Sequence, residues 1–290
     1  MIIITIPAYN EGKTIGQVIS DVHRVMKGKK YKVLVVDDGS KDDTAEVAKR
    51  NKAIVVSHPH NMGLARTFKT EMQKCIELRA DQIVHIDSDG QYKAEDIPKL
   101  LDGLKEADLV LGSRFMGYIE SMPWIKRIGN KAFSKVVSHI TREKITDAQT
   151  GFRAFTRKVA EKLEIRGTYT YTQEQIIDAI EKGFRVKEVP ICFCKRKGPS
   201  HLIKNPLNYA GKAMLGIIRT YRDYEPMKFF GGFGGGFLML GLVLGMYFIT
   251  LHFTIGIHGH LPLMILMILS ILVGLQIVIF GFLADMKRRD

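Results

Sequence analysis

Two short acidic clusters carry the most evident chemistry in this sequence, and each directly follows an apolar run rich in β-branched residues. In the second cluster, Asp87 and Asp89 are one residue apart, so their carboxylates repel each other unless a cation or hydrogen-bond donors lie between them. A hard divalent ion such as Mg²⁺ or Mn²⁺, shared with a diphosphate, is the natural partner for such oxygen ligands. This cluster predicts a metal-assisted diphosphate site, with a solvated turn as the alternative.

The first cluster, Asp37-Asp38-Gly39-Ser40, is less specific. Asp, Gly and Ser are the residues that a tight turn and the start of a helix require, so a plain turn accounts for the same four residues. A ligand-binding role and a turn both stay open for this cluster.

The elements that must position these clusters alternate between strand and helix patterns. Strands are predicted over Ile2–Ile6, Tyr31–Val36, Ala53–Ser57, Asp81–Ile86 and Leu109–Gly112, with helices over Lys13–Met26, Asp43–Asn51, Gly63–Arg79 and Glu95–Glu106. The order predicts an α/β fold, a Rossmann-like and mostly parallel sheet with helices on both faces. Such a sheet binds ligands at the carboxyl ends of its strands. The polar clusters lie there: Pro7–Glu11, Asp37–Ser40, Asp87–Gln91 and Ser113–Arg114.

The C-terminal part has a different composition. Residues 229–284 contain no Lys, Arg, Asp or Glu, although charged residues make up 25% of the 290-residue chain. A polar break at Thr254–His260 divides this stretch into Phe229–Leu251 and Leu261–Ala284, and each piece has the roughly 20 apolar residues needed to cross a bilayer. Two spans with a short connection predict a transmembrane hairpin; the alternative, two buried core helices, would need a larger soluble protein around them.

Basic residues flank both predicted spans: Lys228 precedes the first, and Lys287, Arg288 and Arg289 follow the second. The positive-inside rule places both flanks in the cytoplasm, so the catalytic part and both termini of this multi-pass cell-membrane protein are expected to be cytosolic. The N-terminus lacks the features of a signal peptide. We expect a cytosolic domain over 1–200, interfacial amphipathic helices over 201–228 and the hairpin with its basic tail over 229–290.

The formal net charge of +13 raises the possibility of a nucleic-acid partner. However, the basic residues gather in Lys126–Lys144, Lys195–Lys204 and Lys212–Lys228, toward the membrane-spanning end of the chain. Anionic lipid headgroups and phosphate-bearing substrates explain this placement better. The three cysteines have neither a disulfide framework nor a zinc-ligand spacing.

Five motifs, taken in order, resemble the family 2 glycosyltransferases of the GT-A fold. They are Pro7-Ala8-Tyr9-Asn10-Glu11, Asp37-Asp38-Gly39-Ser40, Asn61-Met62-Gly63, Asp87-Ser88-Asp89-Gly90-Gln91 and Gly112-Ser113-Arg114. Within that family the resemblance is nearest to the dolichyl-phosphate mannose or glucose synthases, and it covers about Met1–Asp223. One departure follows the acidic motif, where Gly90–Glu95 replaces the Leu-Gln-His-Pro-Pro-Glu of many relatives but keeps the Gln and the Glu.

The resemblance implies roles for single residues. The nucleotide sugar would be bound by Pro7, Tyr9, Glu11, Asp37, Asp38 and Asp87, and by Lys195, Arg196 and Ser200 of a basic loop that closes over the diphosphate. Asp89 and Gln91 would ligate the Mg²⁺ or Mn²⁺. Asp89, Arg114, Arg127 and Asp147 would form the catalytic set, and Arg127, Gln149 and Arg153 would bind the acceptor. A solvated basic surface near anionic lipid is the alternative for Lys195–His201.

Asp147 belongs to a motif, Thr146–Arg153, that lines the acceptor site in relatives. An acid there serves as general base where the acceptor is a sugar hydroxyl. A phosphate monoester has a second pKa near 6, so a lipid phosphate is already ionised and nucleophilic at neutral pH. We therefore expect Asp147 to position the acceptor or to hold Arg153, with capping of a helix as the alternative.

The sequence predicts inverting, metal-dependent transfer of a hexose or N-acetylhexosamine from a nucleotide diphosphate sugar to dolichyl or another polyprenyl phosphate. UDP-glucose, UDP-N-acetylglucosamine and GDP-mannose stay open as donors. The nearest rival is transfer to a lipid-linked saccharide or a glycolipid hydroxyl. A nucleotidyltransferase is disfavoured because Ala8–Lys13 is not a Gly-rich phosphate loop, and a non-catalytic membrane adaptor would not need Asp89. Oligomers through the hairpin are compatible with the sequence.

Overall fold

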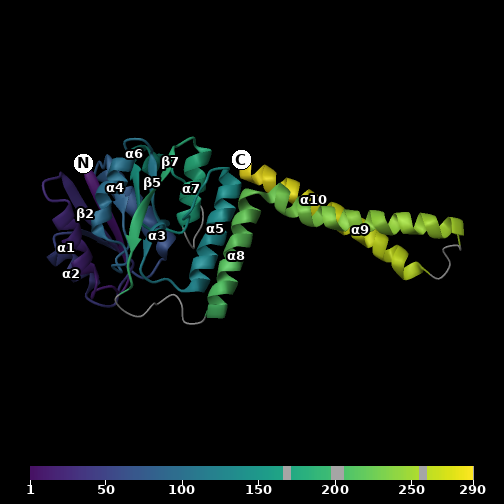
Figure 1. The fold of residues 1–290 in the computed structure, drawn as a ribbon, viewed down its shortest axis with the longest axis horizontal. Helices are drawn as coiled ribbons and strands as arrows, with labels where there is room; N and C mark the ends of the chain where they lie inside the picture. Colours follow the sequence, from purple (N-terminus) through teal and green to yellow (C-terminus); the bar gives the residue numbers. More distant parts are fainter. Residues whose placement is uncertain (166–170, 197–205, 255–259, 290) are drawn as a thin grey trace. The chain divides into compact units, whose positions relative to one another are not determined.

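Seven strands form one mostly parallel sheet in the computed structural model of the chain, which describes residues 1–165, 171–196, 206–254 and 260–289 (Figure 1). The strands are β1 (Ile2–Ala8), β2 (Tyr31–Asp37), β3 (Ile54–Ser57), β4 (Gln82–His85), β5 (Leu109–Ile119), β6 (Arg153–Thr156) and β7 (Val186–Phe193). The helices around them are α1 (Ile15–Val25), α2 (Thr44–Arg50), α3 (Leu64–Glu77), a 3₁₀ turn (Ala94–Asp96) leading into α4 (Ile97–Gly103), α5 (Trp124–Thr141), α6 (Arg157–Lys162) and α7 (Thr172–Glu181).

The strand order is β3-β2-β1-β4-β6-β5-β7. Parallel pairing joins β3, β2, β1 and β4 in one half of the sheet and β5 with β7 in the other. β6 runs antiparallel between β4 and β5 and joins the halves. This mixed sheet confirms the predicted α/β fold class, although the sequence did not predict β6 or β7.

Alternating residues of the central strands face two separate layers, as strand geometry requires. Ile4 and Ile6 of β1 pack into a core cluster with Ile15 of α1 and Ile97 of α4. Thr5, between them, faces the other side of the sheet, where its hydroxyl lies 3.2 Å from Nδ1 of the fully buried His85. Helices therefore cover both faces of the sheet, and the second face holds a buried polar cluster.

The predicted elements agree with the structure to within a few residues, and β5 is the main exception. The predicted strand ends at Gly112, but β5 continues to Ile119. A register irregularity between Ser113 and Tyr118 interrupts its pairing with β7. This extension contains the predicted catalytic Arg114, and its last two residues pair with β7.

The chain divides into two compact units, Met1–Ala210 and Gly211–Asp290. The boundary falls within α8 (Pro206–Tyr224), and the second unit also contains α9 (Pro226–Thr254) and α10 (Leu261–Arg289). By length and composition, α9 and α10 are each able to cross a membrane, and only 11% of the most apolar window of each helix is buried. A core helix of a soluble protein would be mostly buried instead.

α9 and α10 pack closely where both backbones carry glycine. A Cβ atom added to Gly234 of α9 would lie 2.8 Å from the carbonyl oxygen of Gly274 of α10. Small residues allow this approach, which is the usual packing mode of helices in a bilayer. The sequence prediction of two long apolar helices in this region agrees with the structure.

Candidate active site

The turn after β2 holds the neighbouring loop in place. The Asp37 carboxylate accepts a hydrogen bond from the Ser40 amide at 3.1 Å, and the Asp38 carboxylate accepts bonds from the amides of Met62 and Gly63, both at 2.9 Å. Gly39, between them, has a φ of 72°, and a Cβ there would lie 2.5 Å from the backbone of the same loop. Asp38 is thus occupied by the loop that begins α3.

His58 strengthens this connection, because its Nδ1 lies 2.7 Å from Asp38 Oδ1 and its Nε2 lies 2.9 Å from the Thr70 hydroxyl. Asp38 is 5% exposed. These contacts show that Asp38 connects the end of β2 to the loop before α3. Its predicted direct contact with a nucleotide stays a prediction.

The end of β1 lies next to the end of β2. Tyr9 is 40% exposed, so its ring is available as a stacking surface, whereas Pro7 is a buried strand residue. The Glu11 amide donates to the Thr44 hydroxyl at 2.9 Å, and the Glu11 carboxylate accepts from the Thr14 hydroxyl at 2.9 Å. These bonds fix Glu11 at the edge of the sheet with one carboxylate oxygen directed to the basic loop after β7.

Asp87 lies at the end of β4 against the loop that precedes β6. A Cβ added to Gly151 would lie 2.7 Å from both carboxylate oxygens of Asp87, so any larger residue at position 151 would displace this carboxylate. His85 Nε2 lies 3.9 Å from Asp87 Oδ1. Desolvation within the site and then the negative charge of Asp89 raise the pKa of Asp87 to about 6. The sequence analysis predicted a cation site from this repulsion between the Asp87 and Asp89 carboxylates.

Gln91 is held by the backbone after β7, and its own amide holds Asp89. The Gln91 amide donates to Asp89 Oδ1 at 3.0 Å, and Gln91 Nε2 donates to the Cys194 carbonyl at 3.2 Å. The Arg196 guanidinium hydrogen-bonds Glu11 and lies 3.4 Å from Asp89 Oδ2. The structure thus places one predicted nucleotide ligand, Glu11, and one predicted metal ligand, Asp89, on either side of the Arg196 guanidinium.

The oxygen atoms of Asp89 and Gln91 are of the type that Mg²⁺ and Mn²⁺ prefer. In the described part of the chain, no group of three or more His, Cys, Asp or Glu residues is arranged to hold a metal ion. An ion here would take its remaining ligands from a diphosphate and water, which is the usual arrangement for Mg²⁺. The residues present fit such a shared ion.

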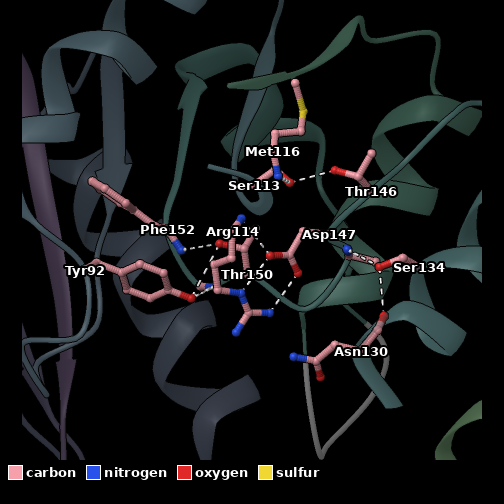
Figure 2. Close-up of polar contacts among 12 residues, drawn as sticks. Tyr92, Ser113, Arg114, Met116, Asn130, Ser134, Thr146, Asp147, Thr150 and Phe152 are labelled. Atoms are coloured by element: carbon pink, nitrogen blue, oxygen red, sulfur yellow. Dashed lines mark hydrogen bonds and ion pairs between the residues drawn. The ribbon is translucent and has the colours of Figure 1, made fainter. Parts of the chain in front are cut away.

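Arg114 and Asp147 form a buried ion pair on the other side of the site (Figure 2). Two side-chain bonds of 2.7 Å and one backbone bond of 3.0 Å join them. Burial lowers the pKa of Arg114, but the hydrogen bonds and negative charge of the Asp147 carboxylate raise it, so the net pKa is raised and the guanidinium stays charged. Glu188 of β7 accepts from the backbone amide of Asp147 at 2.9 Å.

The Arg153 guanidinium is occupied by hydrogen-bond acceptors of the surrounding protein. It donates to the carbonyl oxygens of Ala148, Thr150 and Thr172 and to Gln175 Oε1, and it is fully buried. Asp147 therefore holds Arg114 and not Arg153, contrary to one of the two expectations. Arg153 shapes the loop after Asp147, and its predicted contact with an acceptor stays a prediction.

The remaining predicted residues differ in placement. Arg127 is exposed on α5, Gln149 is half-buried, and Lys195 is exposed with its amide bonded to Glu120 at 2.9 Å. Ser200 lies outside the described residues.

Two features were missed by the sequence analysis. Lys126 of α5 is half-buried, and its ammonium lies 5.8 Å from the centre of the Phe193 ring. Burial and then the positive charge of Arg114 lower the pKa of Lys126. Only the neighbouring Arg127 had been predicted, because the phase of α5 cannot be read from the basic run alone.

The second missed feature is a fully buried cluster beneath Asp87. His85 Nδ1 lies 2.8 Å from Glu71 Oε2, and His85 Nε2 lies 2.7 Å from the Tyr171 hydroxyl. The Tyr171 ring stacks on Phe68 with centroids 3.9 Å apart, and the Arg153 guanidinium lies 5.6 Å from its centroid. The cluster links the strand that carries Asp87 to the helix after the acceptor loop. The sequence signal for this cluster was the presence of Glu71 and His85 at positions where α3 and β4 otherwise bury apolar residues.

The family model "Glycosyl transferase family 2" matches residues 3–164. The dolichyl-phosphate hexose transferase of Haloferax volcanii is 32% identical over 72% of this chain and 87% of its own length. The UDP-N-acetylglucosamine–dolichyl-phosphate N-acetylglucosaminyltransferase of Methanococcus voltae is 32% identical over 66% and 84%. A glucosyl-3-phosphoglycerate synthase structure from Mycobacterium tuberculosis, with Mn²⁺, UDP and phosphoglyceric acid, has a TM-score of 0.59 at 20% identity over 75% and 78%.

Proposed function

Since this chain belongs to glycosyl transferase family 2 and is a glycosyltransferase, we propose that it makes a lipid-phosphate sugar. The donor is a UDP- or GDP-linked hexose or N-acetylhexosamine, and the acceptor is dolichyl or another polyprenyl phosphate. The names of the two archaeal relatives support the acceptor class. The proposed reaction is inverting and depends on Mg²⁺ or Mn²⁺.

The observation that carries the choice of a phosphate acceptor is the occupied carboxylate of Asp147. Both of its oxygens accept bonds from Arg114, and the side chain is fully buried. A carboxylate held in this way is poorly placed to remove a proton from a sugar hydroxyl. A phosphate monoester is largely ionised at neutral pH and needs no such base.

On the donor side, Tyr9, Glu11 and Asp37 would bind the base and ribose at the ends of β1 and β2. Asp89 and Gln91 would hold the divalent ion, which when bound neutralises charge on the diphosphate. The Mn²⁺ and UDP in the structurally similar synthase support this arrangement. Arg196, beside Asp89, would add a donor to the diphosphate as negative charge develops on it.

On the acceptor side, Arg127 would bind the lipid phosphate, and Lys126 would direct it toward the carboxylates. An oxygen of that phosphate forms the new bond to the anomeric carbon while the bond from this carbon to the nucleotide diphosphate breaks. The electron pair leaves with the diphosphate, whose charge Arg196 and the bound ion would stabilise. Attack from the face opposite to the leaving group inverts the anomeric centre.

The membrane topology is also part of the proposal. We infer that α9 and α10 cross the bilayer as a hairpin, with the flanking basic residues and the catalytic unit on the cytoplasmic side. α8, with its mixture of apolar and basic residues, would lie in the membrane interface. This placement would bring the catalytic unit to the surface from which the acceptor phosphate projects.

The test is transfer of radiolabelled sugar from a panel of UDP- and GDP-sugars to dolichyl phosphate by the full-length, detergent-solubilised chain. We expect an organic-extractable product that disappears with a chelator and returns with Mn²⁺ or Mg²⁺. Asp89→Ala should abolish it, while Asp102→Ala, at an exposed carboxylate of α4, should not. If no donor gives product although UDP and Mn²⁺ bind, the acceptor is instead a lipid-linked saccharide or a glycolipid.

A further inference from the structure

α5 presents a stripe of aromatic, apolar and basic side chains to solvent. Trp124, Arg127, Ile128, Lys131 and Lys135 recur at helical spacing and are all exposed, Trp124 at 71% and Ile128 at 59%. We call these five residues the Trp124 stripe. The opposite side of the helix is buried through Asn130, Ser134 and Val137. Solvation alone does not account for a large indole that is 71% exposed on this helix.

Two more exposed side chains precede this stripe on the extension of β5. Tyr118 is 65% exposed, and Met116 is 49% exposed. Single exposed apolar residues are ordinary, but four large ones within the 13 residues from Met116 to Ile128 form a patch that indicates an interaction surface.

The charge of the same segment identifies the partner. Between Glu120 and Glu143 the sequence contains three Lys and two Arg residues but no Asp or Glu. Trp and Tyr prefer the headgroup layer of a bilayer, and Lys and Arg beside them bind anionic lipids. The chain also carries two helices that are long and apolar enough to cross a membrane. An anionic bilayer therefore matches both the exposed aromatic residues and the positive charge of this surface.

We propose that the Trp124 stripe docks into the headgroup layer of an anionic membrane. Trp124 and Ile128 insert among the headgroups, and Lys131 and Lys135 contact lipid phosphates. This surface belongs to the catalytic unit itself and is separate in sequence from α8, α9 and α10. The catalytic unit thus has its own membrane contact, in addition to the covalent connection to the hairpin.

The position of the stripe has a consequence that rests on the proposed function. The Lys126 ammonium and the Arg114 guanidinium lie 5.8 Å and 5.2 Å from the centre of the same Phe193 ring, and the next residue, Arg127, belongs to the membrane-facing stripe. One turn of α5 would then receive a lipid phosphate from the bilayer at Arg127 and direct it inward at Lys126. Docking would align the active site with its acceptor.

Trp124 is the only tryptophan in the chain, so the intrinsic indole fluorescence of the unmodified full-length protein reports on this position alone. The protein is reconstituted into phosphatidylglycerol nanodiscs whose scaffold protein contains no tryptophan, with and without lipids brominated on the acyl chains. We expect a blue-shifted emission that brominated lipids quench and that aqueous acrylamide does not. Emission that acrylamide quenches and brominated lipids leave unchanged would overturn the proposal. Blue-shifted emission without quenching by brominated lipids would also overturn it, because protein would then cover the stripe.

The electrostatic part is tested with Lys131→Gln/Lys135→Gln, at two exposed positions whose loss should not affect folding. Each basic residue near an anionic bilayer contributes enough that the double variant should shift the docking equilibrium about 30-fold toward the undocked state. Brominated-lipid quenching should fall accordingly. Lys49→Gln/Arg50→Gln removes two exposed cations from α2 and should leave quenching unchanged. Equal quenching in both variants would contradict docking through the stripe.

A kinetic readout separates this inference from the proposed function. If wild-type protein transfers sugar, Trp124→Ala should raise the KM for polyprenyl phosphate and leave the KM for the donor unchanged. If wild-type protein transfers nothing, the proposed function fails, yet the fluorescence result still decides whether the stripe docks. Unchanged acceptor KM in an active Trp124→Ala protein would count against the link between docking and acceptor delivery.

Discussion

Arg114 Nε lies 2.7 Å from Asp147 Oδ2, and Arg114 Nη2 lies 2.7 Å from Asp147 Oδ1. This two-point pair joins the middle of β5 to the loop before β6, and both side chains are buried at 3% exposure or less. Glu188 also accepts bonds from the backbone amides of Thr146 and Asp147. The acidic residue at the acceptor side is thus part of a fixed framework whose charge is already balanced.

The first prediction concerns Asp147→Asn. Removing one member of a buried ion pair typically costs about 3–5 kcal/mol, and because Asn keeps one acceptor we expect a loss near the lower end of this range. Chemical unfolding of the detergent-solubilised protein measures the loss. The folded fraction should keep substantial transferase activity, and its kcat should retain the pH dependence of wild type.

Asp102→Asn, at an exposed carboxylate, is the matched control and should melt as wild type does. A contrary result would be an Asp147→Asn protein of normal stability that has lost nearly all turnover together with the acidic limb of its pH profile. Such an outcome would assign Asp147 as a general base and favour a hydroxyl acceptor.

The second prediction concerns Arg196, whose guanidinium contacts Glu11 and Asp89 together. Arg196→Gln should weaken binding of UDP with Mn²⁺ about tenfold, or about 1.4 kcal/mol, because a charged donor to the diphosphate is lost. Binding of Mn²⁺ without nucleotide should strengthen, since Asp89 no longer pairs with a guanidinium. Titration calorimetry measures both affinities. Arg50→Gln serves as the control, and a decrease in both affinities would argue against competition at Asp89.

The third prediction concerns the contact between Gly151 and Asp87. In Gly151→Ala the new methyl group must displace the Asp87 carboxylate, which would lie 2.7 Å away. A side-chain end moves cheaply, so the melting temperature should change by no more than about 4 °C, as expected for a cost near 1 kcal/mol. Donor affinity should nevertheless fall. Gly235→Ala in α9, where a Cβ meets nothing within 4 Å, controls for the substitution itself. Unchanged donor binding would show that Asp87 does not contact the nucleotide.

The sheet and the convergence of the polar clusters were predictable because they follow from local patterns. Short apolar runs such as Ile2–Ile4 and Val33–Val36 indicate buried parallel strands, and the polar residues that follow such strands meet at one edge. β6 was missed because Arg153–Thr156 is four residues long and contains a buried arginine. Its antiparallel pairing depends on neighbours distant in the sequence.

The partners of the site residues were not predictable, because they come from other elements. Asp38 resembles a nucleotide ligand in its motif, yet its oxygens are taken by amides 24 and 25 residues further along the chain. Asp147 was expected to position the acceptor or to hold the nearby Arg153, and in the structure it pairs with Arg114, 33 residues away. Motifs identify which residue types gather at a site, whereas the hydrogen-bond partners depend on the three-dimensional packing.

The last prediction uses the buried pair of Glu71 and His85. Burial raises the pKa of Glu71, an effect that His85 only partly offsets. The folded protein therefore holds a proton on Glu71 at a pH where the unfolded chain, with a pKa of about 4.3, has released it. The free energy of unfolding should fall as pH rises from about 4.3 through the native pKa, and it should then level off.

Glu71→Gln removes this dependence while keeping the shape of the side chain. We expect the melting temperature of the variant relative to wild type to increase with pH across that window, measured on detergent-solubilised protein from pH 4 to 8. Glu77→Gln on the same helix is the control: the pKa of Glu77 is lowered through its hydrogen bond with Lys74, so no gain should appear. If Glu71 were instead ionised against a charged His85, Glu71→Gln would break a buried ion pair and destabilise the protein where both partners are charged. The sign of the change thus decides whether the cluster beneath Asp87 is a neutral hydrogen-bonded link or a buried ion pair.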